Sequence, residues 1–184
     1  MIHQNLTPRQ QVEARAAYAQ VFDPVDIPPL LWTPNYARET LLARRFAAED
    51  NDALVDELLR AQQPLLSGRT TYEFIFTKGA LPPPTTATNR ALLGHILSLE
   101  DRSTIMVIND CCPELRIAET AFAIYRDLDG ETDMDTAAVG VTTSHADLAI
   151  TSPRQVAQYS KLFNDISLHA ENIGGYLDTQ LANT

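Results

Sequence analysis

The sequence predicts a single α+β domain over residues 1–184, with three N-terminal helices, a mostly antiparallel sheet of about five strands with one inserted helix, and a C-terminal helix. Three observations predict this class. Apolar residues recur at helical spacing in the first third of the chain. Short runs rich in β-branched and aromatic residues follow from residue 71 onward. The length of 184 residues fits one domain, because a domain takes roughly 100–200 residues.

Three helix starts share one signature, in which a capping hydroxyl residue precedes a proline at the first helical position. They are Thr7-Pro8, Thr33-Pro34 and Ser152-Pro153. The first helix is expected to continue through the apolar positions Val12, Ala16, Ala19 and Phe22. The second should run to about Ala48, and Asn51 is expected to cap a third.

The strands are expected in the second half of the chain. Residues 71–77, TYEFIFT, form the first, and a loop over 81–89 leads to a helix over about 89–99. Four further strands are predicted over 104–108, 121–128, 137–143 and 147–151. The acidic stretch 127–135 suits an exposed hairpin loop, and Gly174-Gly175 should end the last helix.

Composition excludes several classes of protein. The formal charge is −10, with 14 Lys and Arg against 24 Asp and Glu, so the chain as a whole repels a polyanion and should not bind nucleic acid by itself. No apolar run reaches the ~18–20 residues of a membrane span, and the N-terminus lacks the apolar core of a signal peptide. Cys111 and Cys112 are adjacent, so they cannot link distant segments, and no zinc-ligand spacing surrounds them. We therefore expect a reduced, cytoplasmic protein that needs no metal or cofactor.

One motif carries a resemblance to a known family. Residues 30–38 read Leu-Leu-Trp-Thr-Pro-Asn-Tyr-Ala-Arg. This segment resembles the Leu-Leu-Gln-Thr-Pro-x-Tyr-Ala-Arg segment in the C-terminal domain of Scr-type antitoxin-like helix-turn-helix transcriptional regulators of actinobacteria, with Trp32 in place of the glutamine. The similarity runs from about residue 20 to the C-terminus, where SPRQVAQYSKLF resembles the final helix of that domain. It implies a ligand-sensing scaffold.

The chain departs from that family at charged positions. Lys78 stands where the family has Glu, Asp110 replaces a Pro, and Gly140-Val141-Thr142 replaces a Tyr-x-Glu segment. Fewer than about 20 residues precede the similar region, which is too short for a helix-turn-helix. We therefore expect a stand-alone domain to which operator binding does not carry over.

Three residues are candidates for acid–base catalysis. His145 and Asp147 lie two residues apart in the turn TSHADL, where a carboxylate can orient an imidazole and raise its pKa toward neutrality. Surface residues of a turn are the alternative. Lys78 ends an aromatic strand, so desolvation there would make it a base or an anion clamp, and an exposed loop lysine is the alternative.

Five residues are candidates for binding a ligand. Trp32 and Tyr36 are one helical turn apart and are expected to line a pocket, with core packing as the alternative. Arg38 in the same motif, Asp110 at a strand end and Tyr125 on the strand over 121–128 complete the set. The thiol of Cys111 is flanked by anions, which oppose thiolate formation, so a nucleophile is not expected.

Two functions fit these observations. No phosphate loop, dinucleotide fingerprint or nucleophile elbow is present, so any chemistry should require only positioning and acid–base help. The first function is a stand-alone small-molecule-binding protein recruited to natural-product biosynthesis as a cofactor-free cyclase, isomerase or dehydratase. The second is a non-catalytic antitoxin-like or ligand-sensing regulatory protein that binds a small partner protein or a signal molecule. Homodimer formation stays open.

Overall fold

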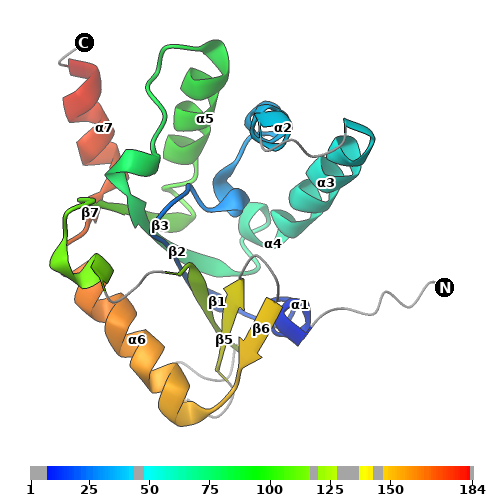
Figure 1. Ribbon diagram of the computed structural model, residues 1–184, viewed down its shortest axis with the longest axis vertical. Coiled ribbons are helices and arrows are strands. Elements are labelled where there is room, and N and C mark those ends of the chain that lie inside the picture. Colours follow the sequence, from blue (N-terminus) through cyan, green and yellow to red (C-terminus); the bar gives the residue numbers. More distant parts are fainter. Residues whose placement is uncertain (1–7, 44–47, 117–119, 128–136, 143–146, 183–184) are drawn as a thin grey trace.

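A computed structural model describes residues 8–43, 48–116, 120–127, 137–142 and 147–182. Its centre is a seven-stranded mixed sheet with the strand order β6-β5-β4-β1-β2-β3-β7 (Figure 1). The strands are β1 (Tyr18–Asp23), β2 (Thr71–Thr77), β3 (Ser103–Ile108), β4 (Phe122–Arg126), β5 (Ala138–Thr142), β6 (Asp147–Ile150) and β7 (Glu171–Asn172). The predicted α+β class is confirmed.

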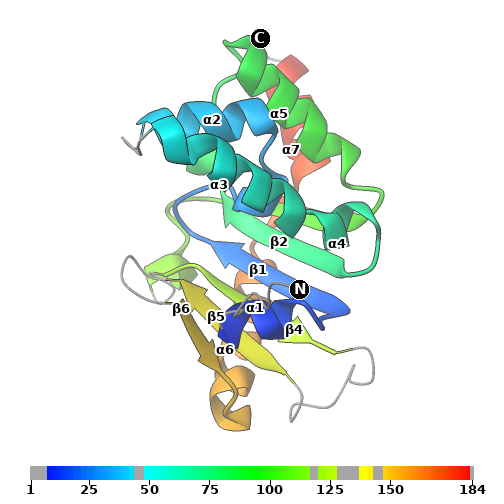
Figure 2. The same cartoon turned by 90° about the vertical axis from the view of Figure 1, so that its right-hand side faces the viewer.

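Helices cover both faces of this sheet. They are α1 (Pro8–Glu13), η1 (Pro29–Leu31), α2 (Pro34–Ala43), α3 (Ala48–Ala61), α4 (Gln63–Leu66), η2 (Lys78–Ala80), α5 (Ala87–Ser98), η3 (Pro113–Arg116), α6 (Pro153–Ser167) and α7 (Ile173–Ala182). We call the face that bears Ala19, Phe74 and Tyr125 the first face, and α2 to α5 and α7 lie on it. The second face bears Phe22, Ile75 and Phe122 and packs against α6 (Figures 1 and 2).

The predicted first helix is wrong beyond its first turns. Helix α1 ends at Glu13, and Tyr18–Asp23 is the central strand β1. Ala19 and Phe22 are both fully buried but on opposite faces of the sheet. In a strand that is buried on both faces, apolar residues are not restricted to alternate positions. The spacing of these residues can therefore fit a helix as well as a strand.

The sheet has more strands than predicted and its centre is parallel. Four of the six pairings among the described strands are antiparallel, but β1 pairs with β2, and β2 with β3, in parallel. Parallel neighbours need long crossover connections, which usually contain helices. The helices α2, α3 and α4 form the crossover between β1 and β2, and α5 forms the next one. They therefore follow the first strand of the sheet instead of preceding the sheet.

Helix starts were predicted well where a proline follows a hydroxyl residue, but the predicted end of the second helix at about Ala48 was wrong, because Ala48 begins α3. Helix α2 begins after Thr33, whose Oγ1 accepts a hydrogen bond from the Tyr36 N–H at 3.3 Å, and α6 begins after Ser152. Two other expectations were wrong. Asn51 is buried inside α3 instead of capping it. The expected acidic hairpin loop lies mostly outside the described residues.

The C-terminal glycines do not end a helix. Gly174-Gly175 lies in the first turn of α7, where the Asn172 Oδ1 accepts hydrogen bonds from both N–H groups at 2.8 and 3.4 Å. A Cβ on Gly174 would lie 2.7 Å from the Glu100 Oε2, so the absence of a side chain lets Glu100 approach the start of the helix. The strand β7 and the helix α7 were both missed, because paired glycines usually mark the end of a helix.

Candidate functional site

The crossover helices leave half of the first face uncovered. Helices α2 to α5 connect β1, β2 and β3, so they lie over that half of the sheet. The other half consists of β4, β5 and β6, and the short helix α1 lies over it (Figure 2). Six residues of helix cannot fill the space above three strands, which leaves room for cavities on both sides of α1.

A row of small side chains forms the floor of this space. The strand register places Val21 opposite Ala123, Ala123 opposite Gly140, and Gly140 opposite Ala149. These four residues lie on one line across β1, β4, β5 and β6, all on the first face because facing residues of adjacent strands project to the same side. Their small volume explains why the floor is hollow.

The first cavity lies between α1 and the segment that contains η1 and α3, and we call it the β1/β4 groove. Its volume is about 500 Å³. Val21, Ala123, Tyr125 and Gly140 form its floor. Its remaining lining residues are Gln10, Glu13, Phe22, Asp23, Pro28, Pro29, Leu30, Glu57, Leu58, Ala61, Ala121 and Phe122. The groove lies on the first face of the sheet, where β4 pairs with β1.

The charged side chains that line the groove are all acidic. Glu13, Asp23 and Glu57 contribute carboxylates, and no Lys, Arg or His is among the described residues of the lining. The Asp23 Oδ1 accepts hydrogen bonds from the backbone N–H groups of Val25 and Asp26 at 3.0 and 2.9 Å, which holds the turn after β1. Burial raises the pKa of Tyr72, beneath α1, to about 12, and the nearby Glu13 carboxylate adds to the shift. The groove therefore has a negative potential over an apolar floor.

Buried hydrogen bonds fix the wall that faces α1. The Gln62 side chain is 2% exposed, and its Nε2 donates to the carbonyl oxygens of Trp32 at 2.7 Å and Pro29 at 3.4 Å. The Trp32 Nε1 donates to the carbonyl oxygen of Ile27 at 2.7 Å. These contacts tie residues 27–32 to the junction of α3 and α4, so the prolines and Leu30 keep their place along the groove.

Gln62→Leu should lower the free energy of unfolding by about 1–3 kcal/mol, because the carbonyl oxygen of Trp32 would lose its buried donor. Urea denaturation measures the change. Gln63→Leu is the matched control, since Gln63 is exposed and its Nε2 reaches only the Leu59 carbonyl oxygen at 3.4 Å. Equal losses in the two variants would show that Gln62 does not hold the wall.

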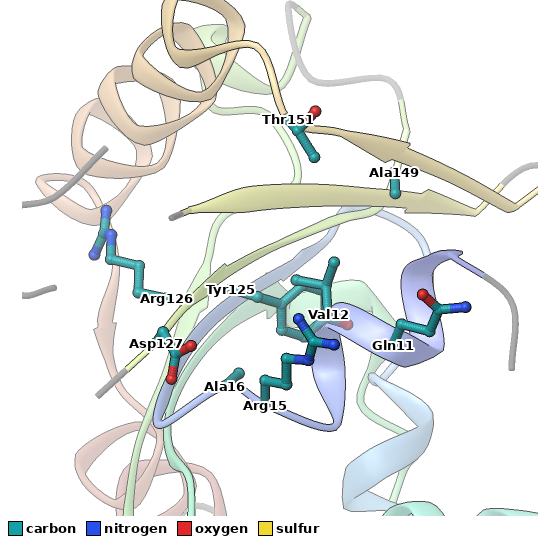
Figure 3. Close-up of a pocket in the computed structure, with 9 residues that line it drawn as sticks. All are labelled: Gln11, Val12, Arg15, Ala16, Tyr125, Arg126, Asp127, Ala149 and Thr151. Carbon is teal, nitrogen blue, oxygen red and sulfur yellow. The ribbon is translucent and has the colours of Figure 1, made fainter. Parts of the chain in front are cut away.

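A second cavity of about 460 Å³ lies on the other side of α1 (Figure 3). Tyr125, which is 3% exposed, lines both this cavity and the groove. The other lining residues are Gln11, Val12, Arg15, Ala16, Arg126, Asp127, Ala149 and Thr151. In contrast to the groove, this cavity has arginines in its lining.

Comparison with protein families identifies the domain. The family model described as "Domain of unknown function (DUF5753)" matches residues 9–172. The chain belongs to this family. No curated protein and no solved structure gives a significant match. The matched residues include α1, every strand of the sheet and all of the lining of the two cavities.

The motif residues Trp32 and Tyr36 of this DUF5753 domain pack against each other. Their rings are 5.6 Å apart at 74°, in an edge-to-face arrangement, and Trp32 is 6% exposed within the core of the first face. Neither lines the groove or the second cavity, but Trp32 adjoins the wall of the groove. Arg38 lies on the exposed side of α2, where its Nε is 3.3 Å from the Asp52 Oδ1.

Lys78 and Asp110 are brought together at the carboxyl ends of β2 and β3, away from both cavities. The Lys78 ammonium group pairs with the Glu171 carboxylate and lies 4.8 Å from the centre of the Tyr176 ring. The Asp110 carboxylate accepts the Gly79 N–H at 3.1 and 3.2 Å. These contacts join β2 to β7 and α7, so they stabilise the C-terminal edge of the sheet.

The remaining predicted residues are less informative. His145 lies outside the described residues, and Asp147 begins β6. Among the predicted residues that the structure describes, Tyr125 lines both of these cavities and the others line neither. In the described part of the DUF5753 domain, no three His, Cys, Asp or Glu side chains are grouped to hold a metal ion. None of its described helices combines the length and the apolar character needed to span a bilayer.

Sequence reasoning missed the residues that create the groove. Glu13 lay within the predicted first helix with no role assigned to it, and Ala123 and Gly140 lay within predicted strands without a predicted role in a pocket. One signal in the sequence was available: small residues alternate with larger ones in Ala121–Tyr125 and Ala138–Thr142. Alternation places every second residue on the same face, so it indicates a strand face with little side-chain volume.

Proposed function

We propose that this DUF5753 domain binds a small, mostly apolar molecule with a cationic group in the β1/β4 groove. The observation that supports this most directly is a cavity of about 500 Å³ with a floor of small residues and only acidic charged groups in its lining. Ligand sites have volumes of roughly 300–1,000 Å³, with apolar walls and a few polar groups that orient the ligand. The groove agrees with that description.

The negative charges of the groove favour a ligand with a positive charge. A cationic group near Glu13 or Glu57 gains Coulomb energy that a neutral group does not, and an anion is repelled. The apolar part of the ligand would lie on Val21, Ala123 and Leu58. Burial of apolar area contributes about 25 cal/mol per Å², so the apolar contact supplies most of the affinity and the carboxylates supply selectivity.

Three probes with one apolar tail test this proposal by NMR titration, followed at the groove residues Val21, Ala123 and Gly140: phenylbutylamine, phenylbutanol and phenylbutyrate. We expect the amine to bind most tightly to the groove and the carboxylate least tightly. Ala123→Leu puts a larger side chain on the floor and should weaken amine binding by at least about tenfold, a difference of about 1.4 kcal/mol. An amine that binds no better than the alcohol would contradict the proposed selectivity.

Ala149→Leu is the matched control for Ala123→Leu. Both alanines belong to the same row of small residues on the same face of the sheet, but Ala149 lines only the second cavity and Ala123 only the groove. The same Ala→Leu change therefore fills the groove in one variant and the second cavity in the other. Amine binding should survive in Ala149→Leu, and equal losses in both variants would rule out the groove as the binding site.

A second candidate function is acid–base catalysis in the same groove, as a cofactor-free cyclase, isomerase or dehydratase. The observation that favours it is the presence of the Glu13 and Glu57 carboxylates and the Tyr125 phenol in the lining of one apolar space. Carboxylates and phenols transfer protons without a cofactor. The resemblance to Scr-type antitoxin-like regulators favours a sensor instead, in which the ligand is bound and released unchanged.

Mass spectrometry of the bound molecule separates catalysis from sensing. The folded chain is incubated with extract of its source cells, and the molecule it retains is identified and then incubated with fresh protein. A product of equal mass, or one lighter by a water molecule, supports the enzyme. Recovery of the molecule unchanged supports the sensor. In the enzyme, Glu13→Gln should remove turnover while the molecule still binds.

A further inference from the structure

Helix α1 presents different residues to the two cavities. Gln10 and Glu13 line the β1/β4 groove, whereas Gln11 and Val12, together with Arg15 in the turn that follows α1, line the second cavity. Successive residues of a helix are rotated by about 100°, so a helix lying between two spaces offers each a different set of side chains. Here the groove receives a carboxylate and the second cavity receives a guanidinium group.

Arg15 has no carboxylate partner among the described residues. Its side chain is exposed, and it forms no ion pair among the residues that the structure describes. Figure 3 shows Arg15, in the turn that follows α1, and Tyr125, on β4, reaching the cavity. A guanidinium group presents parallel N–H donors that match the two oxygens of a carboxylate.

The other arginine of the lining is already engaged elsewhere. The Arg126 Nη2 donates to the Ser160 Oγ of α6 at 3.2 Å, and its guanidinium carbon lies 5.5 Å from the centre of the Tyr18 ring. Figure 3 shows its side chain extending away from Arg15. Arg126 therefore lines the cavity with the base of its side chain and directs its charge toward the second face of the sheet.

The remaining lining residues define the rest of a ligand. Val12, Ala16 and Ala149 offer apolar contact, and Gln11 and Thr151 offer polar side chains. Asp127 also lines the cavity, and its carboxylate accepts hydrogen bonds and repels anions, so it opposes part of the attraction of Arg15. The lining therefore suits one carboxylate on a small, partly apolar molecule, and does not suit a polyanion.

We propose that the second cavity is a separate binding site for a small molecule that carries one carboxylate, which pairs with Arg15. The body of the molecule contacts Val12, Ala16 and Ala149 on the floor and on α1. The site differs from the groove in the sign of charge that it selects. Because the chain as a whole carries a charge of −10, binding of this anion depends on the local contribution of Arg15.

Phenylbutyrate tests this site in NMR titrations of the full chain. In the wild type, we expect its largest amide shifts at Gln11, Arg15 and Ala149. Arg15→Gln should weaken binding about tenfold, because a charge-assisted hydrogen bond is lost. Arg154→Gln removes an exposed arginine from α6, on the other face of the sheet, and should leave binding unchanged.

Two further measurements distinguish binding in the second cavity from binding in the groove. Ala149→Leu should weaken phenylbutyrate binding by filling the cavity, while phenylbutylamine binding in the groove stays as in the wild type. The proposal is overturned if the wild type does not bind phenylbutyrate, if Arg15→Gln binds it as tightly as the wild type, or if its shifts are confined to the groove. Loss of amine binding alone would contradict the proposed function of the groove and leave this site intact.

Discussion

Phe163→Ala should lower the free energy of unfolding by about 3–5 kcal/mol, which is the usual cost of removing a buried aromatic ring. Phe163 is 1% exposed and lies in the core between α6 and the second face of the sheet, among Phe22, Ile124 and Val139. Removal of the ring leaves a cavity in the core. The free-energy cost of this cavity adds to the cost of the lost apolar burial. Urea denaturation at neutral pH measures the effect.

The matched control lies directly after the same helix. Leu168 follows α6 and is 81% exposed, so Leu168→Ala also removes an apolar side chain but should change stability by no more than about 0.5 kcal/mol. Both cavities are on the opposite face of the sheet, so Phe163→Ala should still bind phenylbutylamine at temperatures where it is folded. Similar losses of stability in the two variants would mean that α6 does not form the second core.

Stability should fall steeply above pH 10, and Tyr72→Phe should remove part of that fall. Burial raises the pKa of Tyr72 from 10.0 to about 12 in the folded chain. Between these values the unfolded chain loses the phenolic proton and the folded chain keeps it, so the unfolded state binds fewer protons and stability decreases with pH. The contribution is complete below pH 10 and declines by about 1.4 kcal/mol per pH unit, to a total of about 3 kcal/mol.

Urea denaturation at pH 9, 10 and 11 gives the slope, using samples checked for reversible unfolding. Tyr72→Phe should show a smaller slope than the wild type by about 1.4 kcal/mol per pH unit. Burial also raises the pKa of Tyr18, with a hydrogen bond to Glu73 as the next cause, so Tyr18→Phe should act in the same direction. Identical slopes for the wild type and Tyr72→Phe would show that Tyr72 ionises as readily in the folded chain as in the unfolded one.

Local signals predicted much of the fold. Thr33-Pro34 and Ser152-Pro153 mark helix starts because a proline fits the first helical position, and the Thr33 hydroxyl also caps its helix. The identity of β1 depended on information that is not local. Ala19 and Phe22 suit a helix by spacing, and only the two layers that bury them on opposite sides make their segment a strand. The parallel centre of the sheet was missed as a consequence.

The candidate site was less predictable than the fold. The motif around Trp32 attracted the prediction of a pocket, but Trp32 supports the wall of the groove from within the core. The groove itself depends on the register that aligns Ala123 with Gly140 on adjacent strands, and on α1 ending early enough to leave space. Tyr125 was predicted because of its residue type, whereas its position between two cavities follows only from the tertiary structure.

An NMR titration of the wild-type chain with phenylbutylamine shows whether the β1/β4 groove binds a cationic, mostly apolar molecule. We expect the largest amide shifts at Val21, Ala123 and Gly140 on the floor and at Leu58 on α3, the residues that surround the groove. Shifts confined to other parts of the domain, or affinity for phenylbutyrate at these same residues as high as for the amine, would contradict it.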